Sequence, residues 1–459
     1  LGAILLACVR LGTTTPFPGT AALLPVLGTA MVIGAGSAVP AQGVGRALSL
    51  PPMRAIGRVS YSWYLWHWPL LVLAPPLLGH PLGLPERLAT ALISGGLAVL
   101  TLRFIEDPFR FAASVRRSAA RSLALGGTAT AVAVCVGVVL LVMVPVPVGR
   151  GPAAPALAVT AATSPAGLNV DQYDATVQHM FAQVQAAVAA SADLTAVPSN
   201  LDPPLADAAA ELPTMFLNGC MLNYSEVGHP ECASGDTAST TTVALVGDSN
   251  AAMWNPAFQQ VATQRRWRLE TLTKAECPLL DLPITAELLH REYTECAQWR
   301  DQIITRLRVE HVRLVVLGVS RLYRDPGFTS YDPAWIASLT RLVRQLRDTG
   351  AKVLVLGPTP ISFVWVPICL SGHLDDVPAC SPPRSVAVNE AGITAESAAT
   401  KAGRGQYADI TSLFCTTKRC PAIVGNTLVY LDMVHLTAEY ARLLAPVLGA
   451  LAGRALVSG

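Results

Sequence analysis

Charged side chains are scarce in this sequence of 459 residues: Asp, Glu, Lys and Arg make up 14% of it, whereas 52% is hydrophobic. The mean hydropathy of +0.43 is too high for an ordinary soluble enzyme of this length. The formal net charge is only +2, and no basic stripe with interleaved aromatic residues occurs. These absences argue against a nucleic-acid-binding protein and against a strongly acidic partner.

The apolar excess lies in the first part of the chain. The sequence lacks an initiator Met and the charged segment that opens a signal peptide, so we expect a fragment of a longer protein. Residues 1–149 are predicted to be a truncated membrane region of about five helical spans. Residues 1–9 would be the end of the first span, and the others are expected at 20–37, 60–78, 84–105 and 122–145.

Arginine placement predicts how these spans are oriented, because arginines near span ends are retained on the cytoplasmic side. The two connectors at 38–59 and 106–121 are the arginine-rich ones. We therefore expect them to face the cytoplasm, so that the last span delivers everything after residue 145 to the outside. The aromatic span at 60–78 also contains His67, which we interpret as an interfacial residue rather than part of an acyl pathway.

Cysteine usage supports an extracytoplasmic second half. Zinc-type Cys-x-x-Cys or Cys/His spacings are missing, so we predict no metal site. Eight of the ten cysteines follow residue 219, and an even number at short separations is typical of disulfides in an oxidising compartment. Eight cysteines allow about 105 pairings. We predict that sequence neighbours pair: Cys220 with Cys232, Cys277 with Cys296, Cys369 with Cys380, and Cys415 with Cys420.

The second half divides into two parts by composition. Residues 150–215 are rich in Ala, Pro, Thr and Ser and are predicted to be an extracytoplasmic linker or extension, with one helix near 171–192. From residue 216 to 459, apolar strands alternate with amphipathic helices, which predicts an α/β domain with a parallel sheet. Strands are expected at 242–246, 267–272, 312–317 and 352–356, and helices from about 251 and at 295–308 and 334–348.

The segment Gly247-Asp248-Ser249 follows one of these strands directly. A serine at a strand-to-helix turn exposes its hydroxyl, which is where a nucleophile belongs. Asp432 and His435, before the C-terminal helix, can supply a base for Ser249 and a carboxylate that orients the imidazole. We therefore predict a Ser-His-Asp site for acyl transfer, with Asp248 supporting the turn and the Ser249 amide as the first oxyanion donor. A capped helix start with a surface histidine is the alternative for Asp432 and His435.

These motifs resemble the SGNH hydrolase superfamily over about 216–459, and their neighbours, Lys274 to Pro278 and Cys296 to Arg300, resemble the SGNH domain fused to bacterial membrane acyltransferases. The stretch from Tyr61 to Pro69 is similar to the last part of the acyltransferase-3 family. The resemblance implies a flavodoxin-like three-layer fold behind a multi-pass membrane region.

Three residues in two motifs depart from the pattern of the superfamily. Asn250 stands where a histidine usually follows Gly-Asp-Ser, and an amide can form hydrogen bonds but cannot titrate. Ser320 and Arg321 stand where the superfamily often has an oxyanion-hole asparagine, so no asparagine donor is expected. We include Asp248, Asn250, Ser320 and Arg321 as support residues of the site.

The resemblance implies an envelope O-acyltransferase, most simply an O-acetyltransferase, in the cell membrane with its C-terminal domain outside. Its partners would be the bilayer, a cytoplasmic acyl-CoA as donor and an envelope glycan hydroxyl as acceptor, with no tightly bound cofactor. The sequence does not indicate an oligomeric state. Two other functions use the same residues: an extracytoplasmic carbohydrate esterase, in which water replaces the sugar, and a glycan-binding module without turnover.

Overall fold

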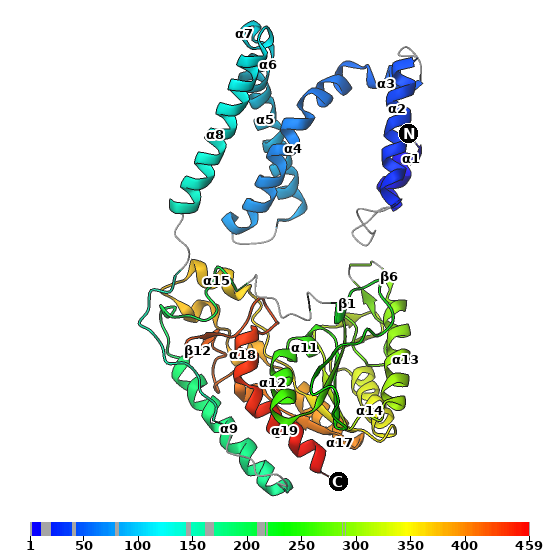
Figure 1. Cartoon of the computed structure of the whole chain (residues 1–459), viewed down its shortest axis with the longest axis vertical. Coiled ribbons are helices and arrows are strands. Elements are labelled where there is room, and N and C mark those ends of the chain that lie inside the picture. The colour runs from blue at the N-terminus through cyan, green and yellow to red at the C-terminus, as the bar shows by residue number, and fades with distance from the viewer. Residues whose placement is uncertain are drawn as a thin grey trace. The chain divides into compact units, whose positions relative to one another are not determined.

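The computed structural model divides the chain into two compact units, Leu1–Val144 and Pro145–Gly459 (Figure 1). Each unit is considered by itself. The structure describes residues 2–10, 20–38, 43–78, 82–143, 148–160, 169–208, 216, 219–286, 288–289 and 291–458.

The described residues of the first unit form helices joined by short non-helical segments. Its helices are α1 (Gly2–Arg10), η1 (Thr20–Ala22), α2 (Leu23–Ala38), α3 (Gly43–Leu48), α4 (Pro51–Leu78), α5 (Leu84–Thr101), η2 (Leu102–Glu106), α6 (Asp107–Phe111), α7 (Ala113–Arg116) and α8 (Ala119–Met143). Helices α4 and α5 are joined by the Trp63 indole, which donates a hydrogen bond to Ser94 Oγ at 2.9 Å. The helical prediction for this region is therefore confirmed.

Two helical stretches of the described residues are long and apolar enough to cross a membrane, Leu84–Phe111 and Ala119–Leu140. They coincide with two of the predicted spans. The segments predicted at 20–37 and 60–78 are helical but do not meet this criterion, because α2 has only 16 residues and Trp, Tyr and His lower the hydropathy of α4. A membrane region with more than these two spans stays a prediction.

The second unit is built on a mainly parallel sheet with the strand order β1-β4-β3-β7-β10-β11. Its strands are β1 (Met221–Leu222), β4 (Arg268–Lys274), β3 (Thr242–Gly247), β7 (Leu314–Gly318), β10 (Lys352–Leu356) and β11 (Gln406–Ala408), with β2 (Ala233–Gly235) antiparallel to β4. When the five main strands are numbered along the chain with β3 as the first, their order in the sheet is 2-1-3-4-5. This is the strand order of flavodoxin-like folds. The parallel α/β prediction is confirmed.

Each central strand sends alternate apolar side chains to opposite faces of the sheet, as the two-residue period of a strand requires. On β3, Val243 and Leu245 join one hydrophobic core, and Ala244 and Val246 join the other. The first core is covered by α12 (Asn255–Arg265), α18 (Ala438–Leu443) and α19 (Ala445–Val457). The second is covered by α13 (Thr294–Val309), α14 (Pro333–Arg347) and α17 (Glu390–Ala402). The result is a three-layer domain.

The remaining elements of this unit are short and lie mostly in loops. They are α11 (Ser249–Ala252), β5 (Thr285–Ala286), β6 (Arg291–Glu292), β8 (Arg324–Asp325), β9 (Phe328–Thr329), α15 (Val366–Gly372), η3 (Val377–Cys380), α16 (Arg384–Ala387), η4 (Thr411–Leu413), β12 (Ile423–Val424) and β13 (Thr427–Leu428).

The described residues of 150–215 do not behave as a free linker. Helix α9 (Val170–Ser191) buries Met180, Val184 and Val188 in the first core, and Val197 and Leu201 join them. Arg454 of α19 donates hydrogen bonds to Asp174 of α9. The Ala- and Pro-rich composition predicted a linker or an extension. Met180, Val184 and Val188 recur every four residues along one face of α9, and the described part of the segment packs against the α/β domain.

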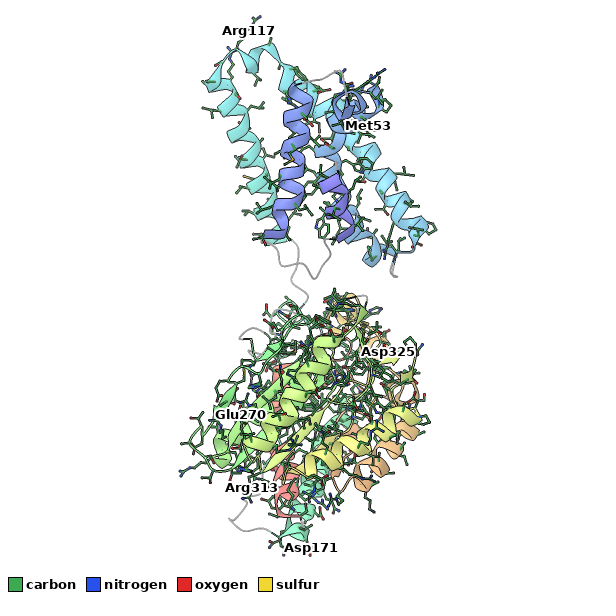
Figure 2. The ribbon with its side chains drawn as sticks, turned by 90° about the vertical axis from the view of Figure 1, so that its right-hand side faces the viewer. Met53, Arg117, Asp171, Glu270, Arg313 and Asp325 are labelled. Carbon is green, nitrogen blue, oxygen red and sulfur yellow. A yellow bond between two sulfur atoms is a disulfide. The ribbon has the colours of Figure 1, made fainter. Side chains whose placement is uncertain are left out.

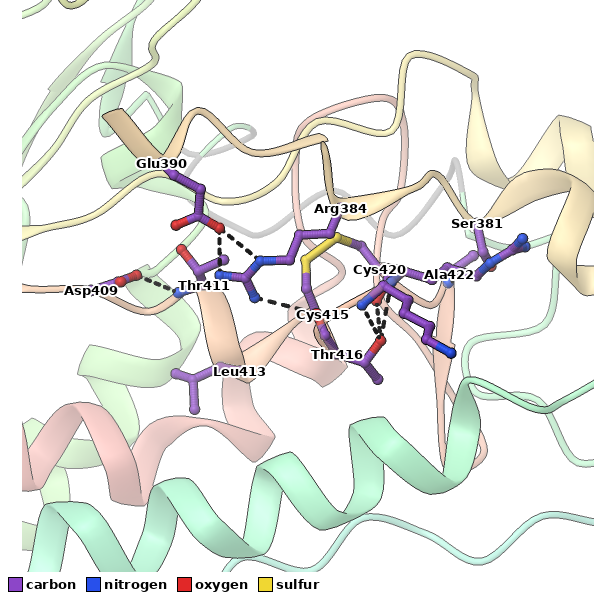
Figure 3. Close-up of a disulfide and its surroundings, with 12 residues drawn as sticks. Ser381, Arg384, Glu390, Asp409, Thr411, Leu413, Cys415, Thr416, Cys420 and Ala422 are labelled. Atoms are coloured by element: carbon purple, nitrogen blue, oxygen red, sulfur yellow. Dashed lines mark hydrogen bonds and ion pairs between the residues drawn. A yellow bond between two sulfur atoms is a disulfide. The ribbon is translucent and has the colours of Figure 1, made fainter. Parts of the chain in front are cut away.

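All four predicted disulfides are present, with Cα–Cα distances between 4.0 and 5.8 Å. The bond between Cys415 and Cys420 closes a loop that Arg384 contacts (Figure 3). Arg384 Nη1 donates to the Thr416 carbonyl at 3.3 Å, and its guanidinium pairs with Glu390 at 2.7 Å. The neighbour-pairing prediction is therefore confirmed.

A buried carboxylate on β4, Glu270, is labelled in Figure 2. It has no exposed surface and pairs with Arg306 of α13 at 3.0 Å and with Arg268 on its own strand. Because a buried charge is costly unless it is paired, this cluster ties α13 to the sheet.

Candidate active site

The strand β3 ends in a turn that only glycine can make. Gly247 has φ +148°, and a Cβ atom there would lie 1.8 Å from the Gly318 carbonyl oxygen at the end of β7. The close approach of these two strand ends fixes the start of α11, whose first residue is Ser249. Ser249 is partly exposed, whereas its neighbours Asp248 and Asn250 are buried. Ser249 thus lies at the strand-to-helix turn where the sequence predicts it.

Asp248 stabilises this turn through hydrogen bonds of its buried carboxylate. Its carboxylate accepts hydrogen bonds from the Asn250 amide at 2.8 Å, the Ser320 amide at 2.8 Å and the Tyr323 hydroxyl at 2.7 Å. Burial raises the pKa of the Asp248 carboxyl, and these donors together with nearby Arg321 offset only part of that increase. Asp248 therefore connects the end of β3 to the loop after β7.

Replacing Asp248 by asparagine is expected to destabilise the domain. Both carboxylate oxygens face N–H or O–H donors, so the amide nitrogen of Asn would meet a donor on whichever side it lay. The expected loss is about 2–3 kcal/mol of unfolding free energy, the usual cost of an unsatisfied buried group. Thermal unfolding followed by tryptophan fluorescence measures it. Asp348→Asn is the control, since Asp348 forms only an exposed pair with Arg404, and equal midpoints for the two variants would contradict the expectation.

The second half of the site is the loop from Asp432 to His435. One carboxylate oxygen of Asp432 contacts His435 Nδ1 at 2.6 Å, and the other accepts from the Val434 and His435 amides at 2.7 Å. Burial raises the pKa of the Asp432 carboxyl, but the hydrogen bonds from His435 and the two amides outweigh it and lower the pKa overall. This pairing assigns the ring proton to Nδ1 and leaves Nε2 as the acceptor.

His435 Nε2 is buried and has no hydrogen-bond partner in the described part of the chain. The ring of Phe216 lies edge-on to the imidazole, with ring centroids 6.2 Å apart. No hydrogen bond links Nε2 to Ser249 Oγ among the described residues, and catalytic hydrogen bonds are often long before substrate binds. A base with an oriented ring and a free nitrogen is what proton abstraction requires.

The two halves border one cavity of about 360 Å³. Asn250, next to Ser249, and Val434, next to His435, both line it. Tyr331 and Asn389 contribute a phenol and an amide to the same wall. The structure thus brings the serine segment and the histidine segment, which are far apart in the sequence, to the rim of one cavity.

The remaining predicted residues contribute through the backbone or through ion pairs. Ser320 contacts Asp248 with its amide, and Asn250 does the same. The guanidinium of Arg321 pairs with Glu396 at 3.0 Å and donates to the Leu356 carbonyl at 2.9 Å. Arg321 therefore lines the cavity with its guanidinium held by a carboxylate that is itself fully buried.

Three residues of the site were not identified from the sequence: Tyr323, Glu396 and Phe216. The Tyr323 hydroxyl donates a hydrogen bond to Asp248. Glu396 pairs with Arg321 and also accepts a hydrogen bond from Trp335 Nε1 at 2.8 Å. No local motif marks them, because each acts on a partner from another element. Tyr323 stood close to the Ser320-Arg321 pair in the sequence, which is the one signal that could have pointed to it.

One group of described residues has metal-ligand geometry, namely Cys369, His373 and Cys380. The two cysteine sulfurs are joined in a disulfide and are not available as thiolates. This group is therefore not a metal centre.

Part of the chain is similar to known proteins. A family model described as an SGNH domain fused to AT3 domains matches residues 219–450. A Bacillus subtilis (strain 168) protein named as a peptidoglycan O-acetyltransferase, YrhL, is 34% identical over 97 residues, which are 21% of this chain and 15% of that protein. The periplasmic domain of a Salmonella ser. Paratyphi A lipopolysaccharide acetyltransferase is 17% identical with a TM-score of 0.37, covering 50% of this chain and 84% of that one.

The family match includes the turn at Ser249, the loop from Asp432 to His435 and all four disulfides. It extends over half of the sequence, from the edge strand β1 into the C-terminal helix α19. The chain belongs to the family of SGNH domains that are fused to AT3 domains.

Proposed function

We propose that this chain is part of a cell-envelope O-acyltransferase that places an acyl group, most simply acetyl, on a glycan hydroxyl outside the membrane. The proposal depends on His435, whose Nδ1 contacts Asp432 at 2.6 Å while Nε2 has no hydrogen-bond partner among the described residues. The name of the Bacillus subtilis relative supports acetyl as the group and a glycan as the acceptor.

The proposed reaction has two steps. Ser249 Oγ attacks the carbonyl carbon of the donor while His435 Nε2 takes its proton, and the donor's leaving group departs with that proton. The acceptor hydroxyl then attacks the Ser249 ester, His435 takes its proton and returns it to Ser249 Oγ. Asp432 stabilises the imidazolium in both steps. The Ser249 amide is the proposed first oxyanion donor, and Asp248 keeps the turn that presents it.

The membrane region would supply the donor. In this proposal residues 1–149 form spans of an acyltransferase-3 region, which pass an acyl group from cytoplasmic acyl-CoA to the outer side. The four disulfides of the second unit support an oxidising, extracytoplasmic location for it. The bilayer, the acyl donor and the glycan are the proposed partners.

Transfer can be distinguished from hydrolysis by the fate of the acyl group. Purified full-length protein would be given a small activated acetyl ester with and without envelope glycan fragments, and both acetylated glycan and free acetate would be counted by mass spectrometry. A transferase gives acetylated glycan in proportion to acceptor concentration. Free acetate alone would identify an esterase, and neither product would identify a binding module.

A further inference from the structure

An uncharged run of residues, in which exposed and buried positions are mixed, lies beside the candidate site. It extends over 361–368, with the sequence Ile-Ser-Phe-Val-Trp-Val-Pro-Ile, and leads into α15. Phe363, Val364, Trp365 and Ile368 are 36–65% exposed, although all four are large and apolar. Phe363 has φ +60°, a left-handed conformation that is uncommon for an aromatic residue, so its position is imposed by the loop. We call these four residues the apolar rim.

Backbone hydrogen bonds fix the apolar rim to the site. The Ser362 amide donates to the Met433 carbonyl at 2.9 Å, and the Val366 amide reaches the Asp432 carbonyl at 3.5 Å. Phe363 also lines the cavity next to Val434. Met433 is 37% exposed, and Val386 of α16, which also lines the cavity, is 58% exposed. The backbone of the rim is therefore attached to the loop that carries His435.

The rim belongs to the part of the second unit where the chain enters it. Arg150 pairs with Asp375, which follows α15, at 2.6 Å. The Gly151 amide binds the Val197 carbonyl, and the Val197 amide binds the Leu374 carbonyl, both at 2.8 Å. Arg150 comes seven positions after Met143, the last residue of α8. Seven residues extend at most about 25 Å, so if α8 spans a bilayer, the α15 end of the domain stays close to its surface.

We infer that the apolar rim docks on the outer surface of the lipid bilayer and holds the site at the membrane. A monomeric soluble surface seldom exposes several adjacent large apolar side chains without a partner. Tryptophan and phenylalanine on an uncharged loop suit the interface between headgroups and acyl chains. The short connection to α8 keeps the rim at high effective concentration near lipid, so even weak insertion suffices.

The inference rests on the extracytoplasmic placement in the proposed function and extends it. It places the cavity where a lipid-borne substrate can reach it, so both the donor and the acceptor can arrive from the plane of the membrane. The described residues of the second unit leave the rim uncovered. Lipid is the proposed occupant of the rim, and the experiment below distinguishes it from a protein partner.

Depth-dependent quenching tests the docking directly. The free cysteines Cys8 and Cys135 would be replaced by alanine in the full chain, and a bimane fluorophore attached through Ile368→Cys or, as control, Val309→Cys. Val309 is 70% exposed at the end of α13. The protein would be reconstituted in phosphatidylcholine vesicles in which a minority of lipids carry a nitroxide near the headgroup. We expect about twofold lower fluorescence at 368 and no change at 309, as for an interfacial side chain.

A functional variant accompanies this measurement. Trp365→Glu with Ile368→Glu should lower transfer to a lipid-linked glycan several-fold and leave turnover of a small soluble ester unchanged. Equal and weak quenching at 368 and 309 would overturn the docking and favour a protein partner for the rim. An impermeant thiol reagent added outside intact spheroplasts must modify Val309→Cys. If it does not, the extracytoplasmic placement itself fails, and the docking fails with it.

Discussion

Cells that carry the full-length protein with Ser249→Ala should lose the acyl esters that it adds to their envelope glycans. The substitution removes only the side-chain hydroxyl. In serine acyl-transfer enzymes, loss of the nucleophile lowers the catalytic rate by roughly 10³-fold to 10⁶-fold. The fold should persist, because Asp248 makes its hydrogen bonds with the amides of Asn250 and Ser320 and with Tyr323 rather than with the Ser249 hydroxyl. Mass spectrometry of the isolated glycans measures the ester content.

Ser199→Ala is the matched control for this change. Ser199 is an exposed serine near the start of the second unit. Its backbone amide donates to the Gly151 carbonyl, and this contact does not depend on the side chain. This variant should retain the ester content of the unmodified protein. If Ser249→Ala, present at the same level by immunoblot, also retained it, Ser249 could not be the acyl carrier.

Asp432→Asn should lower acyl transfer by about 10³-fold to 10⁴-fold while the domain stays folded, as loss of the orienting carboxylate does in serine proteases. Asp432 accepts at both oxygens, from His435 Nδ1 on one side and from two amides on the other. An asparagine that keeps its oxygen toward the amides presents N–H₂ to Nδ1. The ring proton then moves to Nε2, and the base is lost.

Initial rates with purified protein and an activated ester measure this effect. Asp432→Glu restores the charge and should recover part of the rate, whereas a residue with a merely structural role would give no such rescue. A wild-type rate for Asp432→Asn would show that His435 does not act through this carboxylate.

Much of the second unit was predictable because its signals are local. Short continuous apolar runs marked β3, β7 and β10, and α13 and α14 begin and end within two residues of their predicted limits. The disulfides were predictable for the same reason, since each joins cysteines no more than 19 positions apart. Short loops of this kind bring their cysteines together in many folds.

What the sequence did not predict depends on contacts between distant elements. The short strand β11 has little periodicity of its own and is defined by pairing with β10. The packing of α9 needs α19, which comes more than 250 residues later, and Glu396 matters only because Arg321 lies beside it. The serine and histidine segments were predicted to meet, and the shared cavity agrees with that, but the position of Phe216 against His435 has no local signature.

Covalent labelling shows whether Ser249 is a nucleophile that His435 activates. The folded full-length protein would be treated with a fluorophosphonate, and the modified residue identified by peptide mass spectrometry in the unmodified chain and in His435→Ala. We expect labelling at Ser249, with a labelling rate at least about 10²-fold lower in His435→Ala, which is the usual scale of general-base assistance. No labelling of Ser249, or equal labelling in both proteins, would contradict this expectation.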